Sequence, residues 1–72
     1  MLTITDYEGN QVGIGSRVEL HPATDLWMRG ARYGTIDRLK EDNGTLVAMV
    51  RMDHSGVLSL QRIPANLLRA TR

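Results

Sequence analysis

Cysteine is absent from this 72-residue chain, and so is phenylalanine. Without cysteine the chain can form no disulfide, no thiolate zinc site and no cysteine nucleophile. A domain of this size buries only about 60% of the surface that its unfolded chain exposes. The fold must therefore be stabilised by closely packed aliphatic side chains or by association with another chain.

Long apolar runs and an excess of one charge are also missing. No stretch approaches the roughly 18 apolar residues of a membrane span, and the first ten residues lack the basic and then apolar pattern of a signal peptide. We therefore expect a cytoplasmic protein with no membrane contact. Nine Lys and Arg stand against eight Asp and Glu, so the net charge of +1 does not by itself predict nucleic-acid binding.

Catalytic and metal-binding motifs are absent as well. His21, Asp25, Asp53 and His54 stand beside turns, with no His-x-x-x-His or paired-carboxylate spacing. The three serines lie outside any G-x-S-x-G pattern. We expect no catalytic residue, no metal, no cofactor and no small-molecule ligand, and we expect these polar side chains to cap turns.

What the chain does contain is a series of short stretches that alternate apolar and polar residues, which is typical of β-strands. The expected strands are residues 17–20, 33–39, 45–53, 57–63 and 68–71. The Asn43-Gly44 pair predicts a hairpin turn, and residues 64–67 predict one turn of 3₁₀ helix. Val18, Leu20 and Ile36 are the predicted core, and Gly34 predicts a bulge or a close backbone approach.

Residues 1–14, which precede these strands, are expected to form a separate segment. Residues 2–5 and 11–14 alternate on either side of Gly9-Asn10, which predicts a hairpin or two extended arms. We therefore expect an N-terminal arm at residues 1–14 packed on a barrel at residues 15–72. The fold class is all-β: a small barrel of about five antiparallel strands with one 3₁₀ turn before the last strand.

This order of elements resembles the SH3-like barrel superfold over about residues 15–71. The pattern Gly15-Ser16-Arg17-Val18, then Pro22, Trp27 and Gly34-Thr35-Ile36, is similar to the ferredoxin-docking subunit of photosystem I. The Gly-Thr-Ile strand after a long loop also resembles the KOW-type barrels of ribosomal proteins and transcription elongation factors. The first resemblance implies protein docking and the second implies nucleic-acid binding.

Of two further resemblances, one concerns a short segment and the other the whole chain. Residues 60–64, Leu-Gln-Arg-Ile-Pro, are similar to the pore strand of the type II dihydrofolate reductases, which are tetramers of such barrels. That resemblance implies a pore contributed by Gln61 and Ile63 that binds a nucleotide, although the family has an aromatic residue where Ile63 stands. The whole chain also looks like small uncharacterised bacteriophage proteins that carry a similar loop, His-Pro-Ala-Thr-Asp, Trp27, Arg-Gly, Arg-Tyr-Gly. This resemblance implies a phage or bacterial source and allows a virion-associated one.

The loop around the only tryptophan is the strongest candidate site. Arg29 and Arg32 lie between Trp27 and Tyr33, and Trp, Tyr and Arg dominate the hot spots of protein interfaces. Alternatively, Trp27 plugs the core with Met28 filling beside it. A second candidate is a basic stripe across four strands, suited to a nucleic-acid backbone. Its members are Arg17, Arg38, Arg51 and Arg62.

These observations predict a non-enzymatic binding module that acts through loop 27–33 and the neighbouring arginines. Protein docking or homo-oligomerisation is the first expectation, since the charge is balanced and Val47 and Met49 form a second apolar face on one strand. Nucleic-acid binding of the KOW kind is the alternative. A reductase-like homotetramer is the third and only enzymatic hypothesis.

Overall fold

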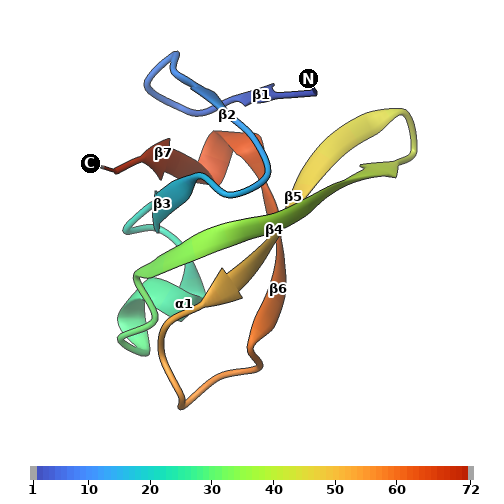
Figure 1. The fold of residues 1–72 in the computed structure, drawn as a ribbon. Helices are drawn as coiled ribbons and strands as arrows, with labels where there is room; N and C mark the ends of the chain where they lie inside the picture. The colour runs from blue at the N-terminus through green and yellow to red at the C-terminus, as the bar shows by residue number, and fades with distance from the viewer. Residues whose placement is uncertain (1, 72) are drawn as a thin grey trace.

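The computed structural model describes residues 2–71, which fold into two antiparallel sheets (Figure 1). The strands of the small sheet are β1 (Ile4–Thr5) and β2 (Gln11–Val12). The large sheet has the order β6-β5-β4-β3-β7, with the bounds β3 Arg17–Leu20, β4 Tyr33–Asp42, β5 Thr45–Met52, β6 Leu60–Pro64 and β7 Leu68–Ala70. The 3₁₀ turn η1 (Ala65–Leu67) precedes the last strand. The all-β prediction of five antiparallel strands, one 3₁₀ turn and an N-terminal hairpin is confirmed.

The large sheet must curl, because its two edge strands are consecutive in the chain. A flat five-stranded sheet would hold its edges about 19 Å apart. The four residue steps from Pro64 at the end of β6 to Leu68 at the start of β7 can span at most about 14 Å. The short connection through η1 therefore rolls the sheet around one face, and that face carries the core.

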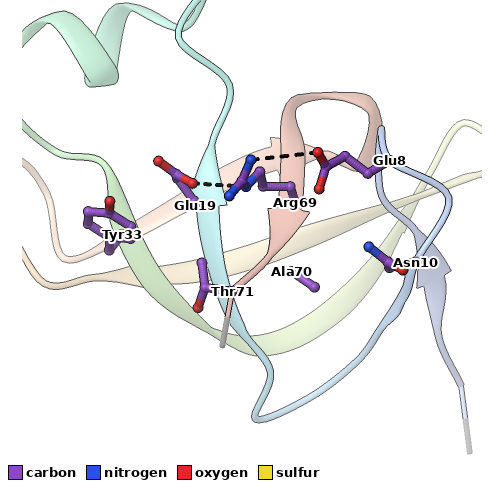
Figure 2. Close-up of a pocket in the computed structure, with 7 residues that line it drawn as sticks. All are labelled: Glu8, Asn10, Glu19, Tyr33, Arg69, Ala70 and Thr71. Carbon is purple, nitrogen blue, oxygen red and sulfur yellow. Dashed lines mark ion pairs between the residues drawn. The ribbon is translucent and has the colours of Figure 1, made fainter.

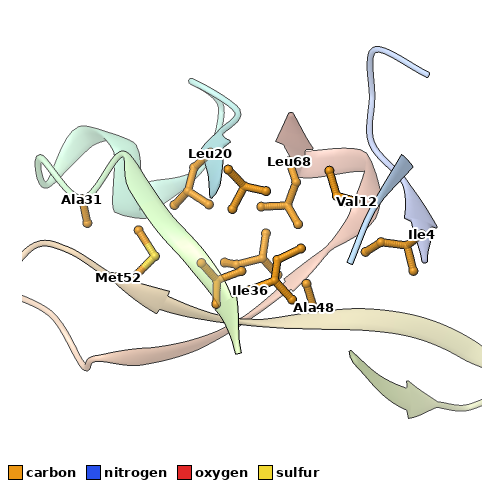
Figure 3. Packing of buried hydrophobic residues seen from close by; sticks show 11 residues of the cluster. Ile4, Val12, Leu20, Ala31, Ile36, Ala48, Met52 and Leu68 are labelled. Carbon is orange, nitrogen blue, oxygen red and sulfur yellow. The ribbon is translucent and has the colours of Figure 1, made fainter. Parts of the chain in front are cut away.

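The core consists of aliphatic side chains from both sheets (Figure 3). Val18, Leu20 and Ile36 are buried as predicted. Ile4 and Val12 of the small sheet join the same cluster, so the N-terminal hairpin covers one end of the core. The other buried apolar residues of the cluster are Ala31, Ala48, Val50, Met52, Ile63 and Leu68.

β4 carries one extra residue that sequence alternation does not reveal. Ile36 pairs with Val50 and Arg38 pairs with Met49, so Asp37 is left over as a bulge. Gly34, where a bulge or a close approach was expected, is a close approach: a Cβ there would lie 2.6 Å from the Arg51 carbonyl oxygen. Beyond the bulge, the inward and outward positions of β4 are exchanged relative to strict alternation.

The hairpin between β4 and β5 is longer than expected. Asn43 and Gly44 have φ of 52° and 82°, as a two-residue type I′ turn requires. Residues 40–42, expected to belong to the turn, continue β4 instead and form the projecting ribbon of Figure 1. In the opposite sense, β6 begins only at Leu60, so residues 53–59 form a longer loop than expected.

The turn of the N-terminal hairpin closes the free edge of β7. The buried Asp6 carboxylate accepts the Ala70 backbone N–H at 2.6 Å and those of Glu8 and Asn10 at 2.9 and 2.8 Å. The Tyr7 N–H donates to the Leu68 carbonyl at 3.0 Å. These contacts pair the exposed edge of a strand that would otherwise be open to association. Across residues 2–71, no helix has the length and apolarity needed to cross a membrane.

Candidate docking surface

The loop between β3 and β4 holds one short helix, α1 (Asp25–Met28). Asp25 was expected to cap it, but the cap is Thr24, whose Oγ1 accepts the Trp27 N–H at 3.2 Å. Thr24 stands one residue before the helix, where the backbone is extended and a hydroxyl can reach the first free N–H groups. Gly30, with φ of 90°, ends the helical turn and leads the chain back to β4.

Trp27 is half-buried and packs against the core, so it is neither a fully enclosed plug nor a free anchor. The Arg32 guanidinium covers its ring at 4.6 Å from the ring centroid, which is a cation–π distance. Met28 was expected to fill the core beside Trp27 but is 82% exposed, because the single helical turn directs Leu26 and Trp27 inward. Arg29 is exposed and pairs with Asp25 at 3.0 Å.

A hollow of about 210 Å³ lies where this loop meets the loop between β5 and β6. Its lining residues are Gly30, Arg32, Tyr33, Asp53 and His54. The loops are joined by the Asp53 N–H, which donates to the Tyr33 carbonyl at 3.1 Å. The His54 ring also fits against Gly30, where a Cβ would lie 3.3 Å from Nε2. The hollow is therefore lined by two segments that are far apart in the sequence and in direct contact in the fold.

Of the large apolar side chains between residues 2 and 71, the two most exposed lie at the same end of the molecule. They are Met28 on α1, at 82%, and Leu58 in the β5–β6 loop, at 78%. In Figure 1, α1 and the β5–β6 loop lie at the same end of the sheet. We call residues 25–33 and 53–58 the docking end. Of the predicted partner-binding residues, all four (Trp27, Arg29, Arg32 and Tyr33) lie within it.

The four sheet arginines share one face, as the stripe hypothesis required. Arg17 and Arg51 flank Thr35 in register, and Arg38 and Arg62 flank Met49. Directly paired residues point to the same side, and the bulge at Asp37 brings Arg38 to this side. The register therefore gathers the arginines, while their binding to phosphate stays a prediction.

Three of these arginines are engaged by carboxylates. Asp37 pairs with Arg51 at 3.1 Å, and Asp42 pairs with Arg62. Arg17 donates to both Asp53 oxygens, at 3.0 and 2.6 Å. This hydrogen-bonded pair lowers the pKa of the Asp53 carboxyl. The face thus carries paired positive and negative side chains. A phosphate would have to displace these carboxylates to bind the arginines.

The apolar face of β5 is largely covered by the chain itself. Val47 is 7% exposed and stands in register between Lys40 and Pro64. Met49 is half-buried between the two arginines of its row. Long cationic side chains cover apolar surface with their methylene stems while the charge stays in water. The expectation that this face needs a partner to cover it is wrong.

The predicted pore residues stand two positions apart on β6 and face the same side, opposite Val50 and Ala48. Ile63 is buried in the core of its own chain, so its side chain is not available to line a pore between subunits. Gln61 is half-buried, and its Nε2 donates to the Leu58 carbonyl at 3.1 Å. β6 alternates, and the inward position of Ile63 follows from its pairing with buried Ala48. Gln61 faces the same side, opposite buried Val50, and of the two residues only Gln61 is partly accessible.

A larger basin of about 550 Å³ lies on the other side of Tyr33 (Figure 2). Arg69 lies at its centre, with Nη1 at 3.6 Å from Glu8 and Nε at 2.9 Å from Glu19, although Nε is not aligned for a hydrogen bond. Glu8, then Glu19 and the Tyr7 hydroxyl, raise the pKa of Arg69. The charged groups of the basin thus form ion pairs with one another. These pairs link the β1–β2 turn to β3 and β7.

Several of these residues were not identified as sites from the sequence. The basin depends on the pairing of β3 with β7, which no local pattern announces. His54 and Asp53 were considered as metal ligands and as turn caps, and His54 does cap its turn by accepting the Gly56 N–H. Within residues 2–71 no three His, Asp or Glu side chains cluster as a metal ion requires. The sequence signal for a closely packed His54 ring was the pair of glycines Gly30 and Gly56, because a Cβ at either position would press against the ring.

Comparison with known proteins gives no matching family model, no similar curated protein and no similar solved structure. The resemblances to the SH3-like superfold, to its photosystem, KOW and reductase members, and to bacteriophage proteins therefore stay predictions.

Proposed function

We propose that this chain is a non-enzymatic binding module that docks a protein through the docking end. The observation that carries the proposal is the concentration of exposed apolar surface there: Met28 and Leu58 stand out from two loops that meet at a preformed hollow. Exposed apolar side chains beside a hollow with Tyr, Trp and Arg are typical of protein interfaces. The partner is another protein or a second copy of the chain.

The other two hypotheses have less support. A nucleic-acid footprint is opposed by the carboxylates that engage Arg17, Arg51 and Arg62. A nucleotide-binding pore lacks one of its two residues, because Ile63 is buried. The bacterial or phage source that we propose with this function rests on the loop resemblance, and we propose a cytoplasmic setting with it.

Site-specific photo-crosslinking in bacterial cells tests the docking function. A photoreactive residue replaces Met28 or Leu58 in turn, and the matched control replaces Asn43, which is exposed at the tip of the β4–β5 ribbon. We expect discrete protein adducts from positions 28 and 58 and none from position 43. With purified protein, an adduct of twice the chain mass identifies the partner as a second copy.

Two outcomes overturn the proposal. Equal adducts from all three positions would show that the docking end is not distinguished from the rest of the surface. Adducts that nuclease digestion removes would favour the nucleic-acid hypothesis instead.

A further inference from the structure

We propose that the docking end recognises a protein segment that presents a carboxylate next to an apolar side chain. The inference rests on the proposed docking function and names the chemistry of the partner. In this arrangement the carboxylate, from an Asp, a Glu or a chain end, pairs with Arg32. The apolar side chain enters the hollow against Tyr33, Gly30 and His54.

Arg32 carries the only uncompensated arginine charge at the docking end. Within residues 2–71, ion pairs to carboxylates engage Arg17, Arg29, Arg51, Arg62 and Arg69. Of the arginines described there, Arg32 and Arg38 alone have no such partner, and Arg38 lies on the sheet face outside the hollow. A cation left unpaired at the rim of a hollow favours an anionic partner.

The Arg32 guanidinium is held in place with its hydrogen-bonding capacity largely unused. It lies over the Trp27 ring, and its Nε donates only a long hydrogen bond of 3.5 Å to the Trp27 carbonyl. Its two terminal nitrogens make no hydrogen bond to any residue between 2 and 71. A stacked guanidinium with free terminal N–H groups matches the two oxygens of a carboxylate.

The rest of the hollow suits an uncharged side chain. The Asp53 carboxylate is occupied by both terminal nitrogens of Arg17. The Nδ1 atom of His54 accepts the Gly56 N–H at 2.9 Å, so this nitrogen is already engaged within the loop. The half-exposed Tyr33 ring and the bare backbone of Gly30 complete an apolar wall. An aliphatic or aromatic side chain gains by burying its surface there.

The probe for this site is 4-methylpentanoate, which joins a carboxylate to a branched aliphatic tail. Acetate lacks the tail and 4-methylpentanamide lacks the charge, so the two controls separate the two parts of the proposal. Side-chain and backbone NMR signals of Arg32 and Tyr33 report binding. We expect saturable shifts with a Kd on the order of 1 mM, as befits so small a ligand, and at least tenfold weaker binding of each control.

Variants assign the binding to Arg32. Arg32→Gln should weaken 4-methylpentanoate binding at least tenfold, whereas Arg38→Gln, the matched change at the other unpaired arginine, should leave it unchanged. Fluorescence of Trp27, the only tryptophan, reports whether the loop stays folded. If Arg32→Gln unfolds the loop, Arg32→Lys keeps the charge but loses the planar fork, and it should weaken binding by a smaller factor.

Equal binding of the amide and the acid would overturn the proposal, and so would shifts centred on Arg38 or equal losses in the two glutamine variants. The crosslinking experiment separates this failure from failure of the docking function. Adducts from positions 28 and 58 without carboxylate binding at Arg32 would leave the docking function standing and remove only its proposed chemistry.

Discussion

Asp6 shows how much one buried carboxylate organises in a small domain. It is the only charged side chain buried among the described residues, at 4% exposure, and it accepts three backbone N–H groups from the hairpin turn and from β7. Hydrogen bonds to an ionised acceptor are about twice as strong as neutral ones. A residue near the start of the chain thereby fixes its last strand.

Asp6→Ala should therefore lower the free energy of unfolding by about 3 kcal/mol, because it leaves three backbone donors without an acceptor. Asp6→Asn keeps one acceptor oxygen but turns a donor toward another donor, so about half that loss is expected. Urea denaturation measures both. Asp25→Ala, which removes an exposed ion pair with Arg29, is the control and should change the free energy by under about 0.5 kcal/mol. A similarly small effect of Asp6→Ala would contradict the role of the Asp6 carboxylate as the acceptor that stabilises the hairpin turn and β7.

The Arg17–Asp53 pair should make stability depend on pH in the acid range. The pair lowers the pKa of Asp53 from its ordinary value of 3.8 in the folded chain. The unfolded chain then binds a proton more readily, so the stabilisation is full above about pH 4 and is lost as pH falls through the folded-state pKa. Both side chains are about half exposed, so we expect a loss below about 1 kcal/mol. Denaturation of the wild type and of Asp53→Asn at pH 6 and below pH 4 measures it, and equal pH dependence in both would exclude this pair as the cause.

Among the elements, β4 depends most on one glycine. A Cβ on Gly34 would lie 2.6 Å from the Arg51 carbonyl oxygen and 2.7 Å from the Val50 side chain, so β4 and β5 would have to separate. Gly34→Ala should cost about 3 kcal/mol in the free energy of unfolding, at the upper end for overpacking. Gly44→Ala meets no atom within 4 Å and should cost only about 1 kcal/mol, through its positive φ. Thermal or urea unfolding compares them, and equal losses would show that the close approach is unimportant.

The strands could be predicted because their signal is local. Alternation around Val18, Leu20 and Ile36 and the Asn43-Gly44 turn are properties of neighbouring residues, and all were confirmed. The bulge at Asp37 depends on which residue of β5 faces which residue of β4, and that choice is made across the sheet. The position of β4 in the chain could therefore be predicted from the sequence. Which side chains beyond the bulge at Asp37 point toward the core could not.

The candidate site was predictable in part for the same reason. The loop with Trp27, Arg32 and Tyr33 was identified from its composition, since these residue types are frequent in interfaces. The contribution of His54 was not, because the β5–β6 loop reaches Gly30 only after both sheets have formed. The exposure of Met28 depends on the direction of a single helical turn, which composition does not determine.

At the scale of the whole molecule, the proposed docking end holds both core residues and exposed ones, since Ala31 belongs to the core and Trp27 packs against it. The core lies between the curled sheet and the N-terminal hairpin, whereas Met28 and Leu58 project from the docking end and are about four-fifths exposed. Exposed side chains contribute little to folding, and their replacement usually changes the free energy of unfolding by under about 0.5 kcal/mol. Met28 and Leu58 can therefore change with little effect on the fold.

The double variant Met28→Ser, Leu58→Ser should keep the unfolding free energy within about 0.5 kcal/mol of the wild type. The same variant should lose most of the crosslinking obtained with a photoreactive residue at the neighbouring Arg29. Leu68→Ala is the opposite control, because Leu68 is fully buried and its truncation should cost about 3 kcal/mol. A clear loss of stability in the double variant would mean that the two side chains pack on the protein itself.

The extra residue at Asp37 divides β4 into two lengths that are out of phase, with Ile36 inward before it and Leu39 inward after it. Deletion of that one residue would leave Ile36, Arg38 and Leu39 paired in unbroken order with Val50, Met49 and Ala48, so the strand would become regular and Leu39 would stay inward. Substitution of Asp37 would remove one surface ion pair. The bulge therefore leaves the inward and outward faces of the paired residues unchanged, and its effect is on the local bend and twist of β4.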